Sequence, residues 1–221
     1  MLLRCVRDHS FQVDVERIRS AARNITRYSH DLKSAEKLDS LRGIEGNAAA
    51  EYFGVFDELI LQNKESFRFA GRNRQPPRDS INAMLSLAYS LLANDCAALF
   101  GVGLDPYVGF MHAERPGRKS LALDLEEELR SVYADRFVLA LINNRIITPN
   151  DFVERETGAV ILSDAGRKRF LGEWQKRKKD EIRHPFLEEK ISWGLVPYVQ
   201  AILLARFIRG DLDQYPPFFW K

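Results

Sequence analysis

The sequence predicts an all-α fold: a single, mostly helical domain over residues 1–221 with one small β-hairpin near 152–162. Three observations predict it. Apolar residues recur with the 3.6-residue period of a helix along most of the chain. No low-complexity linker and no internal repeat interrupts that pattern. The composition, 45% hydrophobic and 29% charged, is that of an ordinary globular domain with enough apolar residues to bury a core.

The N-terminal third carries three predicted helices. Apolar positions scattered among charged residues predict surface helices over 13–25 and 28–41. Residues 44–61 carry a clear apolar stripe at helical spacing, and its members are Ala48, Ala49, Tyr52, Phe53, Phe56, Leu59 and Ile60. An arginine-rich loop over 67–79 follows, because its glycine and paired prolines forbid a continuous helix.

The central third contains the most apolar segment, residues 81–100. Asp79 or Ser80 can cap a helix that begins there. Although the segment is long enough for a membrane span, polar residues interrupt it and no second span follows, so we expect a helix buried within protein. A turn-rich stretch over 101–120 comes next, and then a helix over 123–146.

The C-terminal third begins with the predicted hairpin, in which apolar and polar residues alternate around Thr157-Gly158. A basic helix near 167–183 and an apolar helix over 187–208 follow. The cationic face of the basic helix either contacts DNA or is an ordinary solvated face, because acids are interleaved with its lysines and arginines. The aromatic, proline-rich tail 215–221 is expected to dock or to bind a partner.

Net charge and cysteine usage limit the classes of function. The net charge is only +2, so any nucleic-acid interaction depends on where the basic residues lie. Cys5 and Cys96 lie in separate apolar runs without metal-ligand spacing, which predicts buried thiols in a reducing compartment. The first residues do not form a signal peptide. We therefore expect a soluble, cytoplasmic protein that does not associate with membranes.

Glu45 is the first candidate for chemistry, because it is a single acid among small residues. Its helical neighbours Ala49, Tyr52 and Phe56 belong to the apolar stripe, which predicts a buried carboxylate that needs a cation, a hydrogen-bond donor or a metal. An ion pair with Arg42 or a role in capping a helix explains the residue equally well.

His112, Asp124 and Glu127 are the other candidates. The two acids lie three residues apart and therefore share one face of a helix near its first turn. The helix dipole also explains acids there, with Glu126 and Glu128 solvated, and a lone histidine is more often structural than a ligand. Together with Glu45, these residues have the chemistry of a Mg²⁺ or Mn²⁺ site that leaves positions open for water or phosphate. Such a site can polarise a phosphodiester and activate an attacking hydroxyl.

Two groups of basic residues flank these candidates in the sequence. The first lies in the predicted loop, and the second lies between His112 and Glu127; they comprise Arg68, Arg72, Arg74 and Arg78, and then Arg115, Arg118 and Lys119. Side chains of this kind can hold phosphates beside a metal. The alternative for the first group is a solvated basic loop.

Several segments, taken in order, resemble a known family, the CRISPR-associated endonuclease of the adaptation module, which acts as the spacer integrase. These segments include Gly43-Ile44-Glu45-Gly46-Asn47, then Gly71-Arg72-Asn73-Arg74 through Pro77-Arg78-Asp79, then Gly109-Phe110-Met111-His112, and then Leu121-Ala122-Leu123-Asp124-Leu125-Glu126-Glu127. The resemblance covers nearly the whole chain from about Ser40 onward.

The resemblance implies a helical catalytic domain in which Glu45, His112 and Glu127 bind Mg²⁺ or Mn²⁺. Other members have aspartate where this chain has Glu127, so Asp124 is implied either as a supporting acid or as one that shares or takes the ligand role. His112 acts as a ligand, as a proton carrier or as both. The implied DNA-binding residues are Arg72, Arg74, Arg78, Arg118 and Lys119.

The implied activity is insertion of short DNA fragments into a CRISPR repeat by 3′-hydroxyl attack on a phosphodiester, or cleavage when water is the nucleophile. The implied partners are double-stranded and branched DNA, the small second CRISPR-associated adaptation protein and, in full-length members, a second copy of the chain. The N-terminal β-rich domain of the family is expected to be absent. The alternative function is a non-catalytic DNA-binding or scaffolding domain of the adaptation complex in a prokaryotic cell.

Overall fold

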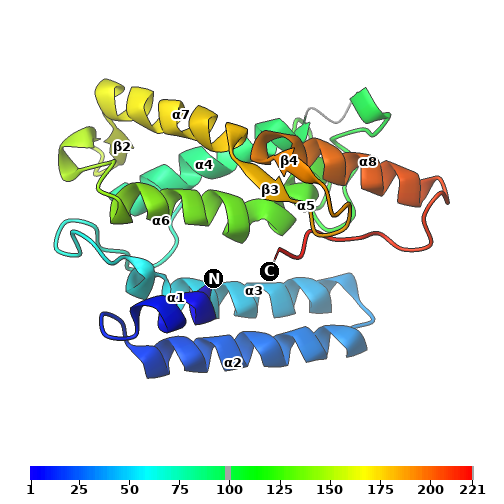
Figure 1. Ribbon diagram of the computed structural model, residues 1–221, viewed down its shortest axis with the longest axis horizontal. Coiled ribbons are helices and arrows are strands. Elements are labelled where there is room, and N and C mark those ends of the chain that lie inside the picture. Colours follow the sequence, from blue (N-terminus) through cyan, green and yellow to red (C-terminus); the bar gives the residue numbers. More distant parts are fainter. Residues whose placement is uncertain (98–100, 221) are drawn as a thin grey trace. The chain divides into compact units, whose positions relative to one another are not determined.

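The computed structural model describes residues 1–97 and 101–220 (Figure 1). The chain divides into two compact units. The first unit comprises Met1–Met84 and Leu139–Ser163, and the second comprises Leu85–Val138 and Asp164–Lys221. The division falls within two helices, α4 (Ser80–Ala97) and α6 (Arg136–Asn143).

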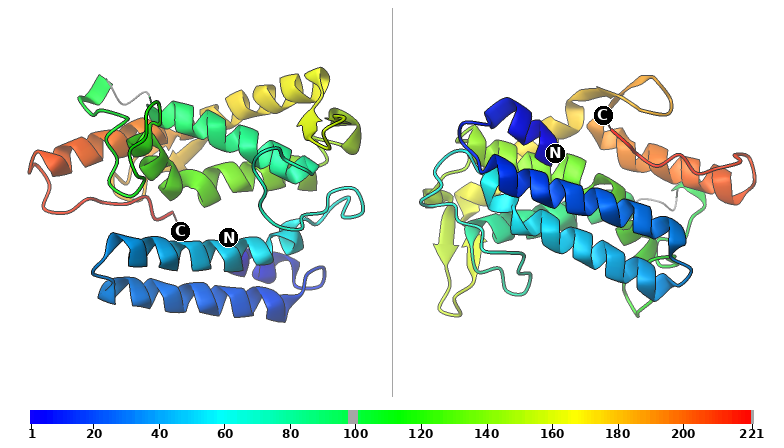
Figure 2. Two further views of the ribbon diagram at one scale, coloured as in Figure 1. Left: turned by 180° about the vertical axis from the view of Figure 1, so that it is seen from behind. Right: turned by 90° about the horizontal axis from the view of Figure 1, so that it is seen from below.

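Three helices begin the first unit: α1 (Leu2–His9), α2 (Val15–Asp31) and α3 (Leu38–Gly54). Both α1 and α3 pack against α2, and α2 and α3 lie side by side in all three views (Figures 1 and 2). A short 3-10 turn, η1 (Leu32–Ser34), follows α2.

The predicted break between residues 25 and 28 was wrong, since α2 runs through it without interruption. Its start is set by Asp14, whose side chain accepts a hydrogen bond from the backbone N–H of Arg17 at 2.9 Å. No proline or glycine lies between Ile25 and Tyr28 to stop the helix.

The buried apolar residues of this part of the chain follow α3 and do not lie along it. No residue of α3 is buried, but Phe56, Leu59 and Ile60 are, in and just after the 3-10 turn η2 (Phe56–Leu59). Phe56 also packs against Phe69, with their ring centroids 5.0 Å apart. The predicted helix over 44–61 therefore ends early, and the apolar stripe is buried mainly through its last residues.

The predicted hairpin is present in the first unit. Strands β1 (Phe152–Glu154) and β2 (Val160–Leu162) pair antiparallel, after the short 3-10 turn η5 (Pro149–Asp151). The turn between the strands contains Gly158 at φ 74°, a conformation that glycine adopts without strain. The alternation of apolar and polar residues predicted this hairpin correctly.

In the second unit, α5 (Ser120–Leu129) continues through a π-helical segment, η4 (Arg130–Asp135), into α6. The π-helical segment places Tyr133 between two indole rings. Its ring stacks on Trp174 at 4.9 Å and on Trp193 at 5.0 Å, with interplanar angles of 18° and 19°. The sequence predicted one helix here and gave no sign of the wider turn.

A second hairpin, which the sequence analysis missed, follows α7 (Asp164–Lys179). Strands β3 (Glu181–Arg183) and β4 (Lys190–Ser192) pair antiparallel where we expected helix. The basic helix ends before Pro185, which cannot continue a helix.

The chain then forms the short 3-10 turn η6 (Trp193–Leu195) and α8 (Val196–Ile208). The predicted apolar helix thus begins later than expected. Pro197 lies in the first turn of α8, where the missing N–H of proline is tolerated, rather than inside the helix.

The predicted apolar helix of the central third is α4. Of the two candidate caps, Asp79 fulfils the role, because its carboxylate accepts from the N–H of Asn82 at 2.7 Å. Residues 98–100 of the predicted helix lie outside the described residues, as does Lys221 of the tail. No helix in the described part of the chain is long and apolar enough to cross a membrane. The prediction of a mostly helical fold is confirmed.

The aromatic stack gives a stability test based on two tyrosines of the second unit. The Tyr133 hydroxyl is buried and has no hydrogen-bond partner among the described residues, whereas the Tyr89 hydroxyl donates to Asp135 at 2.5 Å. We expect Tyr133→Phe to leave the free energy of unfolding unchanged or to raise it by up to about 1 kcal/mol. Tyr89→Phe should lower it by about 1–3 kcal/mol, because the buried Asp135 loses a donor. Urea unfolding of both variants measures the difference, and equal losses would contradict this account.

Candidate active site

The centre of the candidate site is the carboxylate of Asp124, which is fully enclosed on α5. One of its oxygens, Oδ2, accepts from the backbone N–H of Phe110 at 2.7 Å and of Met111 at 3.0 Å. The other, Oδ1, accepts from the N–H of His112 at 2.9 Å and lies 2.7 Å from Nδ1 of the same residue. Four donors therefore converge on one buried carboxylate, so its hydrogen-bonding capacity is satisfied within the protein.

This arrangement fixes the tautomer of His112. A carboxylate with no proton can only accept, so the nitrogen that faces it, Nδ1, carries the hydrogen. Nε2 is left with its lone pair, and in the described part of the chain it makes no hydrogen bond. The side chain is 26% exposed. The imidazole is thus oriented with one nitrogen ready to bind a cation or a proton.

Gly109 explains why the loop before His112 can come so close to α5. A Cβ atom built on Gly109 would lie 2.7 Å from Cβ of Ser120 and 2.8 Å from Oδ2 of Asp124. No side chain fits in that space. The backbone of the same loop also supports α5, because the carbonyl of Pro106 accepts from the N–H of Leu121 at 2.9 Å. The Gly-x-x-His pattern is therefore a packing requirement of this loop.

Glu127 lies one helical turn from Asp124 and faces a different partner. Its Oε1 accepts from Nη1 of Arg130 at 2.5 Å, and its side chain is 35% exposed. The Arg130 guanidinium also lies 5.7 Å from the centre of the Tyr89 ring. Because Arg130 is the first residue of η4, this ion pair joins α5 to the π-helical segment.

The next acid, Glu128, has a role that the sequence analysis missed. A solvated side chain was one of the explanations that the sequence left open, but Glu128 is half-buried and accepts three hydrogen bonds. Its donors are the Tyr215 hydroxyl at 2.6 Å, the Gln200 amide at 2.8 Å and the Phe218 N–H at 3.1 Å. The C-terminal tail is thus anchored to α5, as the docking prediction required. Glu126, for which the same alternative was open, is buried.

Gln200 extends this network to a buried histidine. Nε2 of His184 lies 3.1 Å from Oε1 of Gln200, and its Nδ1 accepts from the N–H of Phe186 and Leu187. Both ring nitrogens are therefore satisfied by the neutral imidazole. Burial lowers the pKa of His184, although the hydrogen bond to Gln200 acts in the opposite direction.

Glu45 lies on α3 in the first unit and is exposed. The prediction that its carboxylate is buried was wrong, because α3 has no fully buried face. Its need for a metal therefore does not follow from desolvation. Among residues 1–97 and 101–220, no group of three or more His, Cys, Asp or Glu side chains is arranged to hold a metal ion.

The arginine-rich loop over 67–79 is tied to the start of α4 by the buried side chain of Asn82. Its Oδ1 accepts from Nη1 of Arg72 at 2.7 Å and from the N–H of Asn73 at 3.0 Å. Its amide donates to the carbonyl of Gly71 and to Asp79. Arg72 thus helps to hold the loop in shape. Of the remaining predicted DNA-binding residues, Arg74 and Arg78 are exposed and Arg118 and Lys119 are half-buried.

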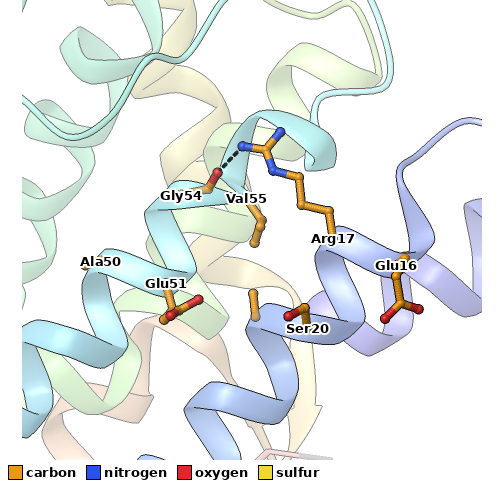
Figure 3. Close-up of a pocket in the computed structure, with 8 residues that line it drawn as sticks. Glu16, Arg17, Ser20, Ala50, Glu51, Gly54 and Val55 are labelled. Atoms are coloured by element: carbon orange, nitrogen blue, oxygen red, sulfur yellow. Dashed lines mark hydrogen bonds between the residues drawn. The ribbon is translucent and has the colours of Figure 1, made fainter.

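A pocket of about 590 Å³ lies between α2 and α3 and contains none of the predicted site residues (Figure 3). Its polar groups hold the two helices together. The guanidinium of Arg17 donates to the carbonyl of Gly54 at 2.6 Å and to Glu58 at 3.1 Å, and Glu51 accepts from Asn24 at 3.0 Å. We assign no ligand to this pocket.

Comparisons with known proteins agree with the resemblance. The family described as CRISPR associated protein Cas1 matches residues 1–176. The chain is 54% identical to CRISPR-associated endonuclease Cas1 2 of Rhodospirillum rubrum, over 100% of this chain and 66% of that protein. It spans just under two thirds of the length of the first curated relatives it matches.

Two solved structures share the fold. A casposase bound to integration product is 26% identical with a TM-score of 0.78, covering 98% of this chain and 58% of its own. A Cas6-RT-Cas1–Cas2 complex is 25% identical with a TM-score of 0.79, covering 92% of this chain and 22% of its own.

The four donors on Asp124 make a stability prediction. Asp124→Asn replaces one acceptor oxygen with an amide NH₂ group, which would face other donors. We therefore expect the free energy of unfolding to fall by about 3 kcal/mol. Glu127→Gln, on the same helix but part-exposed and paired with one arginine, should lower it by less than about 1 kcal/mol. Urea unfolding at neutral pH measures both. Similar losses in the two variants would contradict the central position of Asp124.

The buried His184 makes a prediction about pH. Its folded-state pKa is lowered, so the folded protein binds fewer protons than the unfolded chain between that pKa and the ordinary value of 6.5. The contribution of His184 to stability is therefore full above about pH 6.5 and is lost as the pH falls below it. Urea unfolding from pH 8 to 5 should show a flatter pH dependence in His184→Gln than in wild type. The same change at the exposed His30 should leave the dependence unaltered, and identical curves for wild type and His184→Gln would refute the assignment.

Proposed function

Because the chain belongs to the Cas1 family of CRISPR-associated proteins, we propose that it is the helical part of a metal-dependent DNA endonuclease and integrase. The observation that carries the proposal is the orientation of His112 by the buried Asp124, one helical turn from Glu127. The names of the relatives support a nuclease, since several are called CRISPR-associated endonucleases. The casposase that shares the fold is bound to its integration product, which supports DNA as substrate.

In the proposed integration step, the 3′ oxygen of a short DNA fragment forms a bond to the phosphorus of a phosphodiester at the end of a CRISPR repeat. The bond from that phosphorus to its own 3′ oxygen breaks, and the proton lost by the attacking hydroxyl balances the one that the departing oxygen gains. With water in place of the hydroxyl, the same exchange is hydrolysis.

The donor set fits a hard divalent cation. Carboxylate oxygens with one imidazole nitrogen are ligands that Mg²⁺ and Mn²⁺ accept, and His112 already presents Nε2. We propose His112 and Glu127 as ligands, with Glu45 as the third on the strength of the family motif. A cation there supplies Lewis-acid stabilisation of charge on the transferring phosphate. Binding requires Glu127 to exchange Arg130 for the metal, since the two are paired.

Asp124 is proposed to position His112 and not to bind the metal. Each of its oxygens already accepts two hydrogen bonds, so a metal ion would displace backbone donors of the loop. A carboxylate behind a ligand histidine fixes the ring and makes the free nitrogen a better donor. Of the two readings of Asp124, as a supporting acid or as a ligand, the geometry favours the first.

Phosphate binding is assigned to the basic residues that have exposed or half-buried side chains. Arg74 and Arg78 are exposed in the loop before α4, and Arg118 and Lys119 immediately precede α5. Arginine holds phosphate oxygens through paired N–H groups, and positioning of this kind lowers the barrier without taking part in bond making. For partners, we propose double-stranded and branched DNA and the small second adaptation protein, because the chain matches a complex that contains Cas2.

A strand-transfer and cleavage assay on branched DNA with Mn²⁺ tests the proposal. Wild type is expected to give metal-dependent product, and Glu45→Ala and His112→Ala should lower the rate by roughly a hundredfold or more. Glu114→Ala removes an exposed acid two residues from His112 and should leave the rate unchanged.

Unchanged rates in both site variants would refute the metal assignment. DNA binding that is indifferent to divalent ions, with no product from wild type, would instead favour the alternative of a non-catalytic DNA-binding or scaffolding domain.

A further inference from the structure

The outer face of α7 presents an unusual surface. One side of this helix is buried through Phe170 and Trp174, which pack edge-on against Phe137 at 5.1 and 5.0 Å. At 100° per residue, the opposite side carries Lys168, Gly172, Lys176 and Lys179, which we call the lysine face. All four residues are exposed.

Gly172 is not required by the fold. A glycine inside a helix destabilises it relative to alanine, because the unfolded chain loses more conformational freedom. Yet a Cβ atom built on Gly172 meets nothing within 4 Å, and its backbone is not in the left-handed region. Gly109 differs, since there a Cβ would clash with α5. The described residues therefore give Gly172 no packing role, and lysines lie one turn away on each side of it.

The charge of α7 is concentrated and partly uncompensated. Its 16 residues include seven lysines and arginines but only two acids, in a chain whose net charge is only +2. On its flank, Lys178 pairs with Asp95 at 2.6 Å and Arg177 with Asp180 at 3.1 Å. On the lysine face, Lys176 contacts Glu173 at 2.5 Å.

Lys168 and Lys179 make no ion pair with any described residue. They lie 11 residues apart, about 16 Å along the helix axis. No large apolar side chain lies between them on this face. A protein partner would need such a side chain as an anchor. A DNA duplex carries a charge for about every 1.7 Å of its axis, so a row of this length reaches several phosphates.

We propose that the lysine face of α7 binds the phosphate backbone of duplex DNA without reading its sequence, and that Gly172 lets the backbone approach the helix. This inference rests on the proposed function for its substrate but involves none of the residues assigned there. Lysine contacts to phosphate fix the position of a duplex and contribute affinity that falls with salt. The face would therefore position DNA, and it would not take part in bond making.

The test measures binding to a 30-base-pair duplex of arbitrary sequence by fluorescence anisotropy, in EDTA and over a range of salt concentrations. Lys168→Gln combined with Lys179→Gln is expected to weaken binding by roughly tenfold or more at 0.1 M salt and to reduce the slope of log K against log salt by about 2. The matched control is Lys33→Gln with Lys37→Gln, two exposed lysines between α2 and α3, and it should bind as wild type does. No loss in the first pair, or the same loss in the control, would overturn the proposal.

A second variant separates folding from binding. Gly172→Leu should raise the melting temperature, because leucine is a good helix former in a position with open space. It should also weaken duplex binding several-fold by holding the phosphates away. A higher melting temperature with unchanged affinity would overturn the role given to Gly172.

The outcomes distinguish this inference from the proposed function. Duplex binding that depends on the lysine face, in a protein that gives no product with Mn²⁺, would leave the inference standing and remove the catalytic proposal. Metal-dependent product, together with duplex binding that the lysine-face variants do not weaken, would support the catalytic proposal and overturn the inference. Failure of wild type to bind duplex DNA at all would overturn the inference.

Discussion

The candidate site depends on the hydrogen bonds that the carboxylate of Asp124 accepts. The carboxylate gathers three backbone N–H groups and one imidazole nitrogen into a space from which solvent is excluded. An enclosed charge is costly unless donors surround it, and here the donors come from a loop that has no helix or strand to hold it otherwise. The same four contacts therefore compensate the charge, fasten the loop and orient His112. The absent side chain of Gly109 is what allows the loop to come close enough.

Helix α5 uses its successive acids for different tasks because a helix turns by 100° per residue. Asp124 faces the loop, Glu127 faces Arg130 and Glu128 faces the C-terminal tail. The tail adds aromatic contacts to this anchoring, since Phe218 packs on both Trp193 and His184. The candidate site thus lies on a helix that is held on more than one side, which is how a rigid element keeps functional groups in place.

The sequence predicted the helical fold and the first hairpin because these follow from local periodicity and turn residues. It predicted that the tail docks or binds a partner, but not that Glu128 is the anchor, since a run of acids near a helix start can equally be solvated. The second hairpin was missed because its turn, residues 184–189, contains no glycine like the one that marked the turn of the first hairpin. The π-helical segment left no pattern at all. The expected burial of Glu45 was wrong because small residues on a stripe do not by themselves bring a neighbour against it.

The family motif predicted His112 and Asp124 as site residues, and the structure adds that the Asp124 carboxylate accepts from the backbone and contacts the ring of His112. Sequence spacing puts Asp124 and Glu127 on one face and leaves both as possible ligands. The direction of the Asp124 carboxylate depends on the loop that folds back over α5, and that contact is not encoded in the helix itself. Three residues, Gly109, His112 and Asp124, have to be read together before the orientation is apparent.

The ¹⁵N chemical shifts of the His112 ring at neutral pH test the central claim most directly. In protein labelled at histidine, a protonated nitrogen and a bare one give clearly different shifts. We expect Nδ1 to carry the hydrogen and Nε2 to be bare, since Asp124 can only accept. A neutral ring with its hydrogen on Nε2 would contradict the account, because Asp124 would then not be holding the imidazole.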